Sequence, residues 1–353
     1  MTTQIYIVLY SLFFLFGFSI FLFSYISIRR LIISHREKRN QNLRQLIESA
    51  ILKMLTSDYQ NDHQLTLKEY VRYPEIFTEV LLEFWQTLSG SSRQQLKNIF
   101  STYLKEKHKK DITSKRTIKR AKAAKAFVLF ADEDEAITIM NLLQDKPLVK
   151  MAALTALTLN PQPQIMKIIF KAFIQESKIP LRYYFDLFTA MGKTIEPYVK
   201  DILHQPLPEE KLSLLVELIG TIPLNFLYPE LIRLSLHPSK EIRTKTARTL
   251  GNLSLPLEEI IETLLLMAED EAWEVKAQAL KSLGKLRVKK AIPLLAQALF
   301  SHSWYCRLNG GHALVRLGEE GLEILQKIAR QKKDPYAADM AKMILDEIMI
   351  MQG

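Results

Sequence analysis

The chain has 353 residues, 48% of them apolar, with a formal net charge of +10 and one cysteine. A single cysteine excludes an intrachain disulfide and a metal cluster held by thiolates. The apolar content is enough for a large core, and the sequence has almost no alternating strand pattern. We therefore expect an all-α protein.

The first element in chain order is an apolar segment. Residues 5–28 contain no charged side chain, and these 24 residues would rise about 36 Å as a helix at ~1.5 Å each, which is enough to cross a bilayer. The start lacks the basic residues and the cleavage site of a signal peptide, so residues 1–30 are predicted to be a retained transmembrane anchor. Basic residues follow the span and none precedes it, which predicts an outside N-terminus and a cytoplasmic body. They are Arg29, Arg30, Arg36, Lys38, Arg39 and Arg44.

Residues 31–110 are predicted to form an amphipathic helix and degenerate N-terminal capping helices. Apolar residues recur at helical spacing over 42–57, and this face needs a partner, which is either the first repeat units or the membrane surface. Residues 58–66 are polar and predict a loop. Residues 75–107 predict two helices divided near Gly90.

From residue 111 to 353 the chain repeats a helical phrase. The phrase has an apolar or basic residue, a second and usually basic residue, two small residues in mid-helix, and then small and apolar residues. Its starts are spaced by 30, 34, 28, 31, 33, 31 and 31 residues, and they are Lys119, Val149, Tyr183, Lys211, Ile242, Val275, Cys306 and Ala337. One such helix–turn–helix unit cannot bury its apolar face alone, so stacked copies are expected to share a continuous core. Prolines stand between the copies, where turns are needed.

The small residues of the phrase predict close packing between units. Ala123-Ala124 and Gly310-Gly311 occupy mid-helix positions where neighbouring backbones must approach each other. Four further glycines recur with the repeat and do not cluster in a phosphate-binding loop, so we interpret them as structural: Gly220, Gly251, Gly284 and Gly318.

These repeats resemble the HEAT family, particularly its PBS-lyase-type HEAT-like members, over roughly residues 111 to 350. The resemblance implies an α-solenoid of armadillo type that binds another molecule. It also implies that the basic second residues of the phrase bridge to acidic residues in neighbouring turns, with ligand binding as the alternative. The basic residues are Lys150, Arg243, Lys276 and Arg307, and the acidic candidates are Asp145, Asp270 and Glu271.

The positive charge is local. Residues 105–125 carry ten Lys or Arg against two acidic residues, and residues 29–44 carry six against one, so the rest of the chain is mildly acidic. The cluster at residues 105–125 has three interpretations: a solvated helix face, a docking patch for an anionic leaflet or acidic protein, or a nucleic-acid contact. Nucleic acid is the least favoured because no aromatic residues are interleaved for base stacking. The candidate basic docking patch is Lys115, Arg116, Lys119, Arg120, Lys122 and Lys125.

Three aromatic residues share a place in successive repeats. Trp273 and Trp304 each stand two residues before a phrase start, and Tyr336 is close to the next equivalent position. They either pack against the adjacent unit or form a hot-spot strip for a protein partner.

Residues that would support catalysis are scattered. None of the seven histidines pairs with another at helical metal spacing, so we predict no catalytic, cofactor or metal site. The hypothesis is a non-catalytic, membrane-anchored scaffold or regulatory adaptor that binds protein partners at the membrane, with anionic lipid as a further candidate. Its rivals are a bilin-lyase-like enzyme that holds a chromophore, and a nucleic-acid binder acting through residues 105–125.

Overall fold

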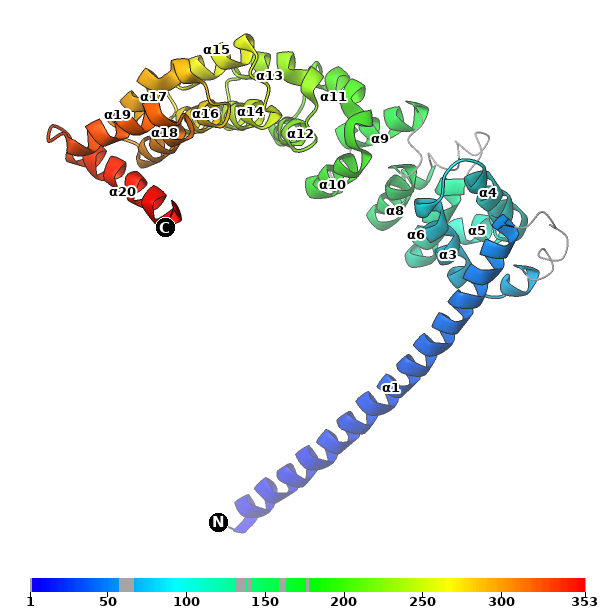
Figure 1. Ribbon diagram of the computed structural model, residues 1–353. Helices are drawn as coiled ribbons and strands as arrows, with labels where there is room; N and C mark the ends of the chain where they lie inside the picture. The colour runs from blue at the N-terminus through cyan, green and yellow to red at the C-terminus, as the bar shows by residue number, and fades with distance from the viewer. Residues whose placement is uncertain are drawn as a thin grey trace. The chain divides into compact units, whose positions relative to one another are not determined.

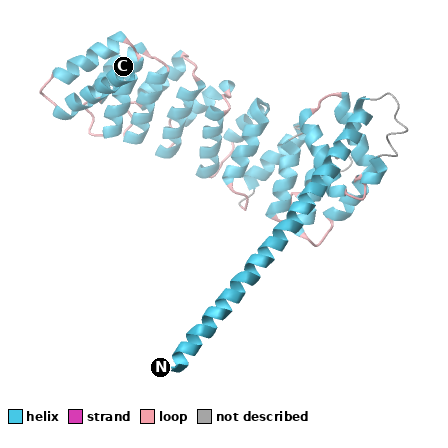
Figure 2. Cartoon of the chain, turned by 60° about the horizontal axis from the view of Figure 1, so that its bottom comes forward, coloured by secondary structure: helices cyan, strands magenta, loops and turns pink. Residues whose placement is uncertain are grey.

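The computed structural model describes residues 2–56, 67–130, 138, 141–158, 163–175 and 178–352. Over these residues the chain is helical, with turns and no strand (Figure 2), so the predicted all-α class is confirmed. The loop predicted at 58–66 lies outside the described residues. The chain divides into two compact units, Met1–Ala156 and Leu157–Gly353, which are described in turn.

The first unit begins with a continuous helix of 55 residues, α1 (Thr2–Thr56), seen at full length in Figure 1. It joins the predicted span, its basic flank and the predicted amphipathic helix without a break at residue 30. Residues 29–56 contain neither proline nor glycine, and therefore nothing in them interrupts the helix.

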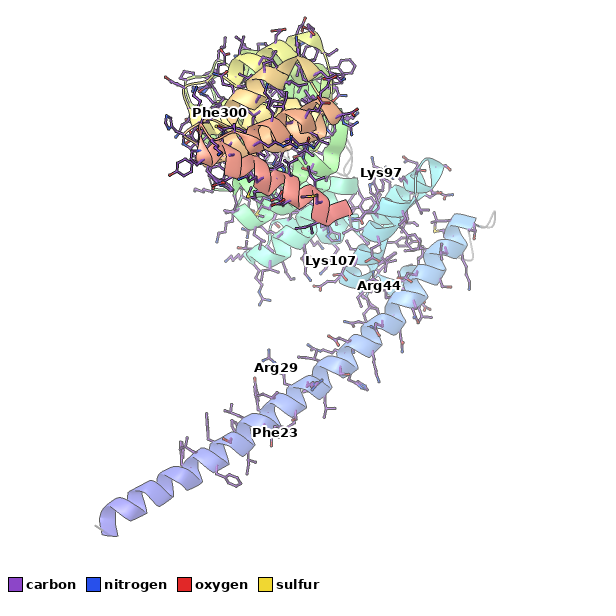
Figure 3. All side chains as sticks on the ribbon, turned by 60° about the vertical axis from the view of Figure 1, so that its left-hand side comes forward. Phe23, Arg29, Arg44, Lys97, Lys107 and Phe300 are labelled. Atoms are coloured by element: carbon purple, nitrogen blue, oxygen red, sulfur yellow. The ribbon has the colours of Figure 1, made fainter. Side chains whose placement is uncertain are left out.

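The N-terminal part of α1 exposes its apolar side chains. Phe14, Phe21 and Phe23 are 65–73% exposed, and other large apolar side chains down to Ile33 are exposed as well. Figure 3 labels Phe23 within this stretch and Arg29 just beyond it. By length and composition α1 is a helix that could cross a membrane.

The C-terminal part of α1 belongs to the folded body of the first unit. Ile47, Ala50 and Ile51 are buried where α1 packs on α3 (Pro74–Thr87). Arg44 forms ion pairs with Glu48 of α1 and with Glu83 of α3. Part of the amphipathic face is thus covered, by a helix of the predicted capping segment and not by the first repeat units, while Leu46 is exposed.

The rest of the first unit is a set of short helices: α4 (Ser91–Tyr103), α5 (Lys105–Ile112), α6 (Thr117–Phe130) and α8 (Pro147–Thr158), the last of which runs into the second unit. The predicted division near Gly90 is confirmed, because Gly90 has φ +63° and precedes α4. Phe100 and Phe130 stack at 4.6 Å between ring centroids in the core, with Trp85 edge-on to Phe130.

The second unit stacks helices in two layers. In Figure 1, α12, α14, α16 and α18 lie side by side in one layer, and α13, α15, α17 and α19 form the other. The first layer is α12 (Glu209–Thr221), α14 (Lys240–Leu253), α16 (Trp273–Lys285) and α18 (Trp304–Arg316). The second layer is α13 (Tyr228–Leu234), α15 (Glu258–Met267), α17 (Ile292–Ala298) and α19 (Glu319–Arg330). The remaining helices are α9 (Pro163–Gln175), α10 (Leu181–Met191), α11 (Glu196–Leu203) and α20 (Pro335–Gln352), with 3-10 turns at Gly192–Ile195, Asn225–Leu227 and Lys289–Ala291.

The predicted repeat register is confirmed at every copy. Each of the eight phrase starts, from Lys119 in α6 to Ala337 in α20, is the third residue of a helix. This holds even for the copies at Tyr183, Lys211 and Ala337, which lack the basic second residue. The paired small residues are buried, so the phrase marks the face along which successive units meet.

Glycines allow the layer α12–α18 to pack closely. A Cβ on Gly251 would lie 2.5 Å from Oγ of Ser282, and one on Gly284 would lie 2.5 Å from Cβ of Ala313 in the next helix. A hydrogen bond stabilises the contact between α14 and α16, because Oγ of Ser282 donates to the Ala247 carbonyl at 2.7 Å. The predicted structural role of these glycines is therefore confirmed; Gly318 has a different task, a turn at φ +81° before α19.

Candidate functional site

The arginine row of the repeats is the first predicted feature that the structure places. Arg243 of α14 holds Asp270 through two hydrogen bonds, Nε to Oδ2 at 2.7 Å and Nη2 to Oδ1 at 2.9 Å. Both side chains are about one-eighth exposed, and the Arg243 pKa is raised by its hydrogen bond to Asp270. Of the other acidic candidates, Glu271 acts on Arg243 only through its charge. The structural interpretation of the row thus holds at this repeat.

Arg120 makes the same interaction in the first unit. Its Nε lies 2.6 Å from Oδ2 of Asp145 and its Nη2 lies 2.8 Å from Oδ1. The hydrogen bonds from Arg120 lower the pKa of Asp145. Arg120 is the second residue of the phrase that starts at Lys119, but the sequence analysis assigned it to the basic docking patch and left it out of the row. In the structure Arg120 forms this ion pair and is largely buried, so it is not part of the exposed basic patch.

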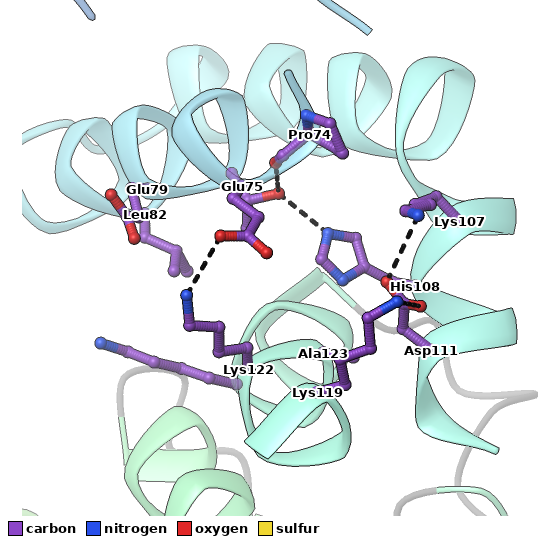
Figure 4. Close-up of a pocket in the computed structure, with 12 residues that line it drawn as sticks. Pro74, Glu75, Glu79, Leu82, Lys107, His108, Asp111, Lys119, Lys122 and Ala123 are labelled. Atoms are coloured by element: carbon purple, nitrogen blue, oxygen red, sulfur yellow. Dashed lines mark hydrogen bonds and ion pairs between the residues drawn. The ribbon is translucent and has the colours of Figure 1, made fainter. Parts of the chain in front are cut away.

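Two lysines of the predicted basic patch also have acidic neighbours. They border a cavity of about 280 Å³ between α3, α5 and α6 (Figure 4). Lys122 lies 3.2 Å from Glu75 of α3, and Lys119 lies 3.6 Å from Asp111 of α5. Lys125 lines the same cavity. The cavity therefore carries charges of both signs, and Glu75 of α3 offsets part of the positive charge of residues 105–125.

Two residues of the patch keep the exposed character that was predicted. Lys115 and Arg116 lie in the turn between α5 and α6, and both are exposed. The described residues supply no carboxylate within ion-pair distance of either side chain. These two cations are consequently the part of the patch most available to an anionic surface.

His108 is a titratable residue of this region that the sequence did not single out. It is buried, stacks on Phe100 at 5.3 Å, and its Nε2 lies 2.8 Å from Oγ1 of Thr78. Thr78 also lies 2.6 Å from the Pro74 carbonyl, to which its single hydroxyl hydrogen donates. Nε2–H of His108 then donates to Thr78, and Nδ1 is a buried acceptor without a donor. Burial lowers the His108 pKa to about 4. The motif search missed it because a lone histidine on a lysine-rich helix shows no sign of burial.

The predicted aromatic residues lie at the start of three helices. Trp273 and Trp304 are the first residues of α16 and α18, and Tyr336 is the second residue of α20. All three are exposed, at 44%, 47% and 72%. The structure therefore leaves them accessible at one edge of the second unit.

Tyr305 connects the two tryptophans. Its ring stacks on Trp273 at 5.2 Å between centroids and 14° between planes, and Trp304 meets it edge-on at 5.2 Å. Tyr305 is itself 54% exposed. We call Trp273, Trp304, Tyr305 and Tyr336 the aromatic strip. The sequence analysis named Tyr336 but not Tyr305, although both are the second residue of their helix and stand one residue before a phrase start.

Comparison with known proteins agrees with the repeat architecture. The HEAT repeats family matches residues 261–345, which cover α15 to α20 in part or in full. Together with the two helical layers, this match defines a solenoid of helical repeats that contains HEAT repeats. A comparison with curated proteins gives no match.

Three solved structures show weak likeness to the chain. The Escherichia coli protein YibA is 16% identical, with 74% of this chain and 98% of YibA covered and a TM-score of 0.40. Kap121p in its complex with Nup53p is 10% identical over 86% of this chain, at a TM-score of 0.48, and the chain spans 41% of its length. The CpcE–CpcF complex of phycocyanin lyase from Nostoc is 15% identical, with 69% and 94% covered and a TM-score of 0.29.

Proposed function

We propose that the chain is a non-catalytic, membrane-anchored scaffold or adaptor that binds a protein partner through the aromatic strip of its second unit. The observation that carries the proposal is that the stacked pair Trp273 and Tyr305, with Trp304 against it, remains about half exposed. Tryptophan and tyrosine at the centre of protein interfaces supply much of the binding free energy. Rings that are already held in place lose little conformational freedom on binding.

Packing between neighbouring repeats accounts for only one side of the Trp273 and Tyr305 rings. By contrast, the stacked rings of Phe100 and Phe130 in the first unit are each 1% exposed. Trp273 and Tyr305 also connect neighbouring helices, yet each leaves about half of its surface to solvent. A stretch of exposed aromatic surface on a folded protein is typical of an interaction site.

The exposed apolar part of α1 supports the anchor. Its large apolar side chains point to solvent in the absence of a bilayer, a costly arrangement that insertion into lipid would relieve. The arginines that follow it favour a cytoplasmic repeat domain. The proposed molecule therefore presents the aromatic strip from a domain tethered to the inner surface of the membrane.

The test of binding is partner recovery by crosslinking in intact cells. The wild-type chain is compared with the Trp273→Ala/Trp304→Ala variant and with a matched control, Phe226→Ala/Leu236→Ala, which removes two other exposed apolar side chains of the second unit. We expect one protein to be recovered with wild type and control and lost with the tryptophan variant. Truncation of a true hot spot costs on the order of 2 kcal/mol or more. If the tryptophan variant is folded and still recovers every partner, the aromatic strip serves only packing between repeats and the proposal is wrong.

The test of the anchor is fractionation and protease accessibility. We expect the full chain to stay in membranes after high-salt washing, to keep its N-terminal peptide, and to be protected from protease outside intact cells. A chain lacking residues 1–30 should be soluble. Loss of the N-terminal peptide would indicate a cleaved signal sequence, and digestion of the repeats from outside would reverse the orientation.

A further inference from the structure

Three arginines of the repeats are held in the same way by the preceding turn. In each, Nη1 donates to the backbone carbonyl six residues earlier: Arg120 to Ser114 at 2.7 Å, Arg243 to His237 at 3.0 Å and Arg307 to Ser301 at 2.7 Å. The shared bond orients the three guanidinium groups alike at the start of their helices. The partner of the remaining edge, formed by Nε and Nη2, then depends on the turn of the next repeat.

For the first two arginines that edge meets a carboxylate. Nε and Nη2 of Arg120 bind Asp145, which stands two residues before α8, and those of Arg243 bind Asp270, which stands three residues before α16. Paired N–H groups on a planar guanidinium match the two oxygens of a carboxylate, and this geometry is specific as well as strong. Two repeats thus show what the position accepts.

At Arg307 the corresponding positions are basic. Lys333 and Lys332 stand two and three residues before α20, where the other repeats have aspartate. Asp334 is close in sequence, and its Oδ1 accepts a hydrogen bond from the backbone N–H of Ala337, as Oδ1 of Asp145 and of Asp270 does from a nearby backbone N–H. Among the described residues no carboxylate forms an ion pair with Arg307, and its buried Nε–H has no acceptor. A buried donor left without an acceptor destabilises the fold, and an added acceptor would relieve this.

The surroundings of Arg307 connect it to the aromatic strip. Trp304 lies one helical turn earlier on α18, and the guanidinium carbon of Arg307 lies over the ring of Tyr336 at 5.7 Å from its centroid. A ring on the flat face of a guanidinium leaves its N–H edge free to bind in the plane. The exposed Lys332 and Lys333 add positive charge at the same end of the unit.

We propose that the Arg307 guanidinium binds an aspartate or glutamate carboxylate of the protein partner through Nη2, a small shift of the side chain bringing the buried Nε–H into the same contact, beside an apolar or aromatic side chain that packs on Trp304 and Tyr336. The partner completes, from outside, the ion pair that Asp145 and Asp270 complete within the chain. This inference rests on the proposed protein-binding function and specifies the chemistry of the partner segment. The positive charge around Arg307 favours the same acidic ligand.

The experiment selects a displayed library of random peptides on the detergent-solubilised full chain. We expect enrichment of peptides that combine an acidic residue with an aromatic or large apolar residue. For an enriched peptide, Arg307→Gln should weaken binding roughly ten-fold or more, and so should changing the peptide's aspartate to asparagine or its glutamate to glutamine. If the two groups meet, the doubly changed pair should bind no more weakly than either single change.

Control variants separate the alternatives. Arg307→Lys keeps the charge but not the paired N–H edge, and should restore only part of the affinity. Arg243→Gln should leave peptide binding unchanged, because its carboxylate partner is internal. Asp334→Asn should also leave it unchanged; an effect equal to that of Arg307→Gln would show an internal pair and overturn the inference.

Two further outcomes would overturn it in distinguishable ways. Enrichment of peptides without acidic residues, with binding lost in Trp304→Ala but retained in Arg307→Gln, would refute the carboxylate and leave the aromatic strip as the binding surface. Peptides that bind wild type and the Trp273→Ala/Trp304→Ala variant equally would refute both. Circular dichroism of each variant checks that it is folded.

Discussion

Two aromatic groups in the second unit use similar contacts and differ in exposure. Phe173, Tyr184 and Phe188, on α9 and α10, meet at 5.3–6.0 Å between centroids and are fully buried. Trp273, Trp304 and Tyr305 meet at 5.2 Å and are about half exposed. Contact between rings therefore stabilises the stack in both places, but only the second group keeps surface that a partner can cover.

The face on which each ring lies explains the difference. Phe173 and Phe188 are on the buried faces of α9 and α10. Trp273 and Trp304 are the first residues of their helices and are about half exposed. The same residue types thus contribute to the core or to a surface according to the helix face they occupy.

The largest expected effect separates the two aromatic groups by stability. Phe188→Ala removes a fully buried ring and should lower the free energy of unfolding by about 3–5 kcal/mol. Tyr305→Ala removes a ring that is half in water and should cost clearly less. Urea unfolding followed by circular dichroism measures both. Equal losses would mean that the strip is part of the core and would remove the basis for the proposed interface.

A second test uses the buried aromatic stack of the first unit, which contains a titratable ring. The pKa of His108 is about 4 in the folded chain, against about 6.5 when unfolded. The unfolded chain binds the proton more readily, so stability is full above pH 6.5 and falls as the pH drops toward 4. The loss should reach about 3 kcal/mol.

The variant His108→Phe keeps a ring against Phe100 and cannot titrate. Its unfolding free energy should fall less than that of wild type between pH 6.5 and 4, because the variant lacks the buried imidazole that takes up a proton on unfolding. Lys107 adds to the penalty for a charged imidazole, while Asp111 opposes it. Parallel pH profiles for the two proteins would show that His108 is accessible to solvent.

The third test concerns the packed side of α18, which carries the strip at its start. A Cβ on Gly311 would lie 2.2 Å from Cδ1 of Ile344 in α20, so Gly311→Leu should overpack this contact at a cost of about 1–3 kcal/mol. His312→Leu, at the next and partly exposed position, is the matched control and should change stability little. A lower melting temperature for the control alone would mean that the register of α18 is misplaced.

The smallest effect is expected at the exposed cations of the first unit. In a chain lacking residues 1–30, Lys115→Gln/Arg116→Gln should weaken binding to vesicles that contain phosphatidylserine by about 1 kcal/mol per residue. Added salt should weaken wild-type binding in the same assay, because exposed charges are screened. Arg120→Gln should instead lower stability, since it leaves Asp145 without its partner. Salt-independent vesicle binding would contradict a role for these cations.

The sequence by itself determined the helical class, the repeat register and the long apolar segment at the N-terminus. These follow from local patterns: prolines stand at helix starts, small residues recur at the contact face, and every phrase start proved to be the third residue of a helix. Such patterns can be found in the sequence because each copy must fold locally in the same way before it stacks.

Only the tertiary structure decided which charges and rings meet. Lys122 pairs with Glu75, which is 47 residues away in the sequence, and Arg120 pairs with Asp145, which is 25 residues away. Tyr305 stacks on Trp273 of the preceding helix in its layer. Net charge along the sequence overstated the basic patch because it cannot register these partners. Tyr305 shares its repeat position with Tyr336, but its stack on Trp273 cannot be read from that position. Pairings between helices depend on how neighbouring units stack, and this geometry is set by the packed interface as a whole.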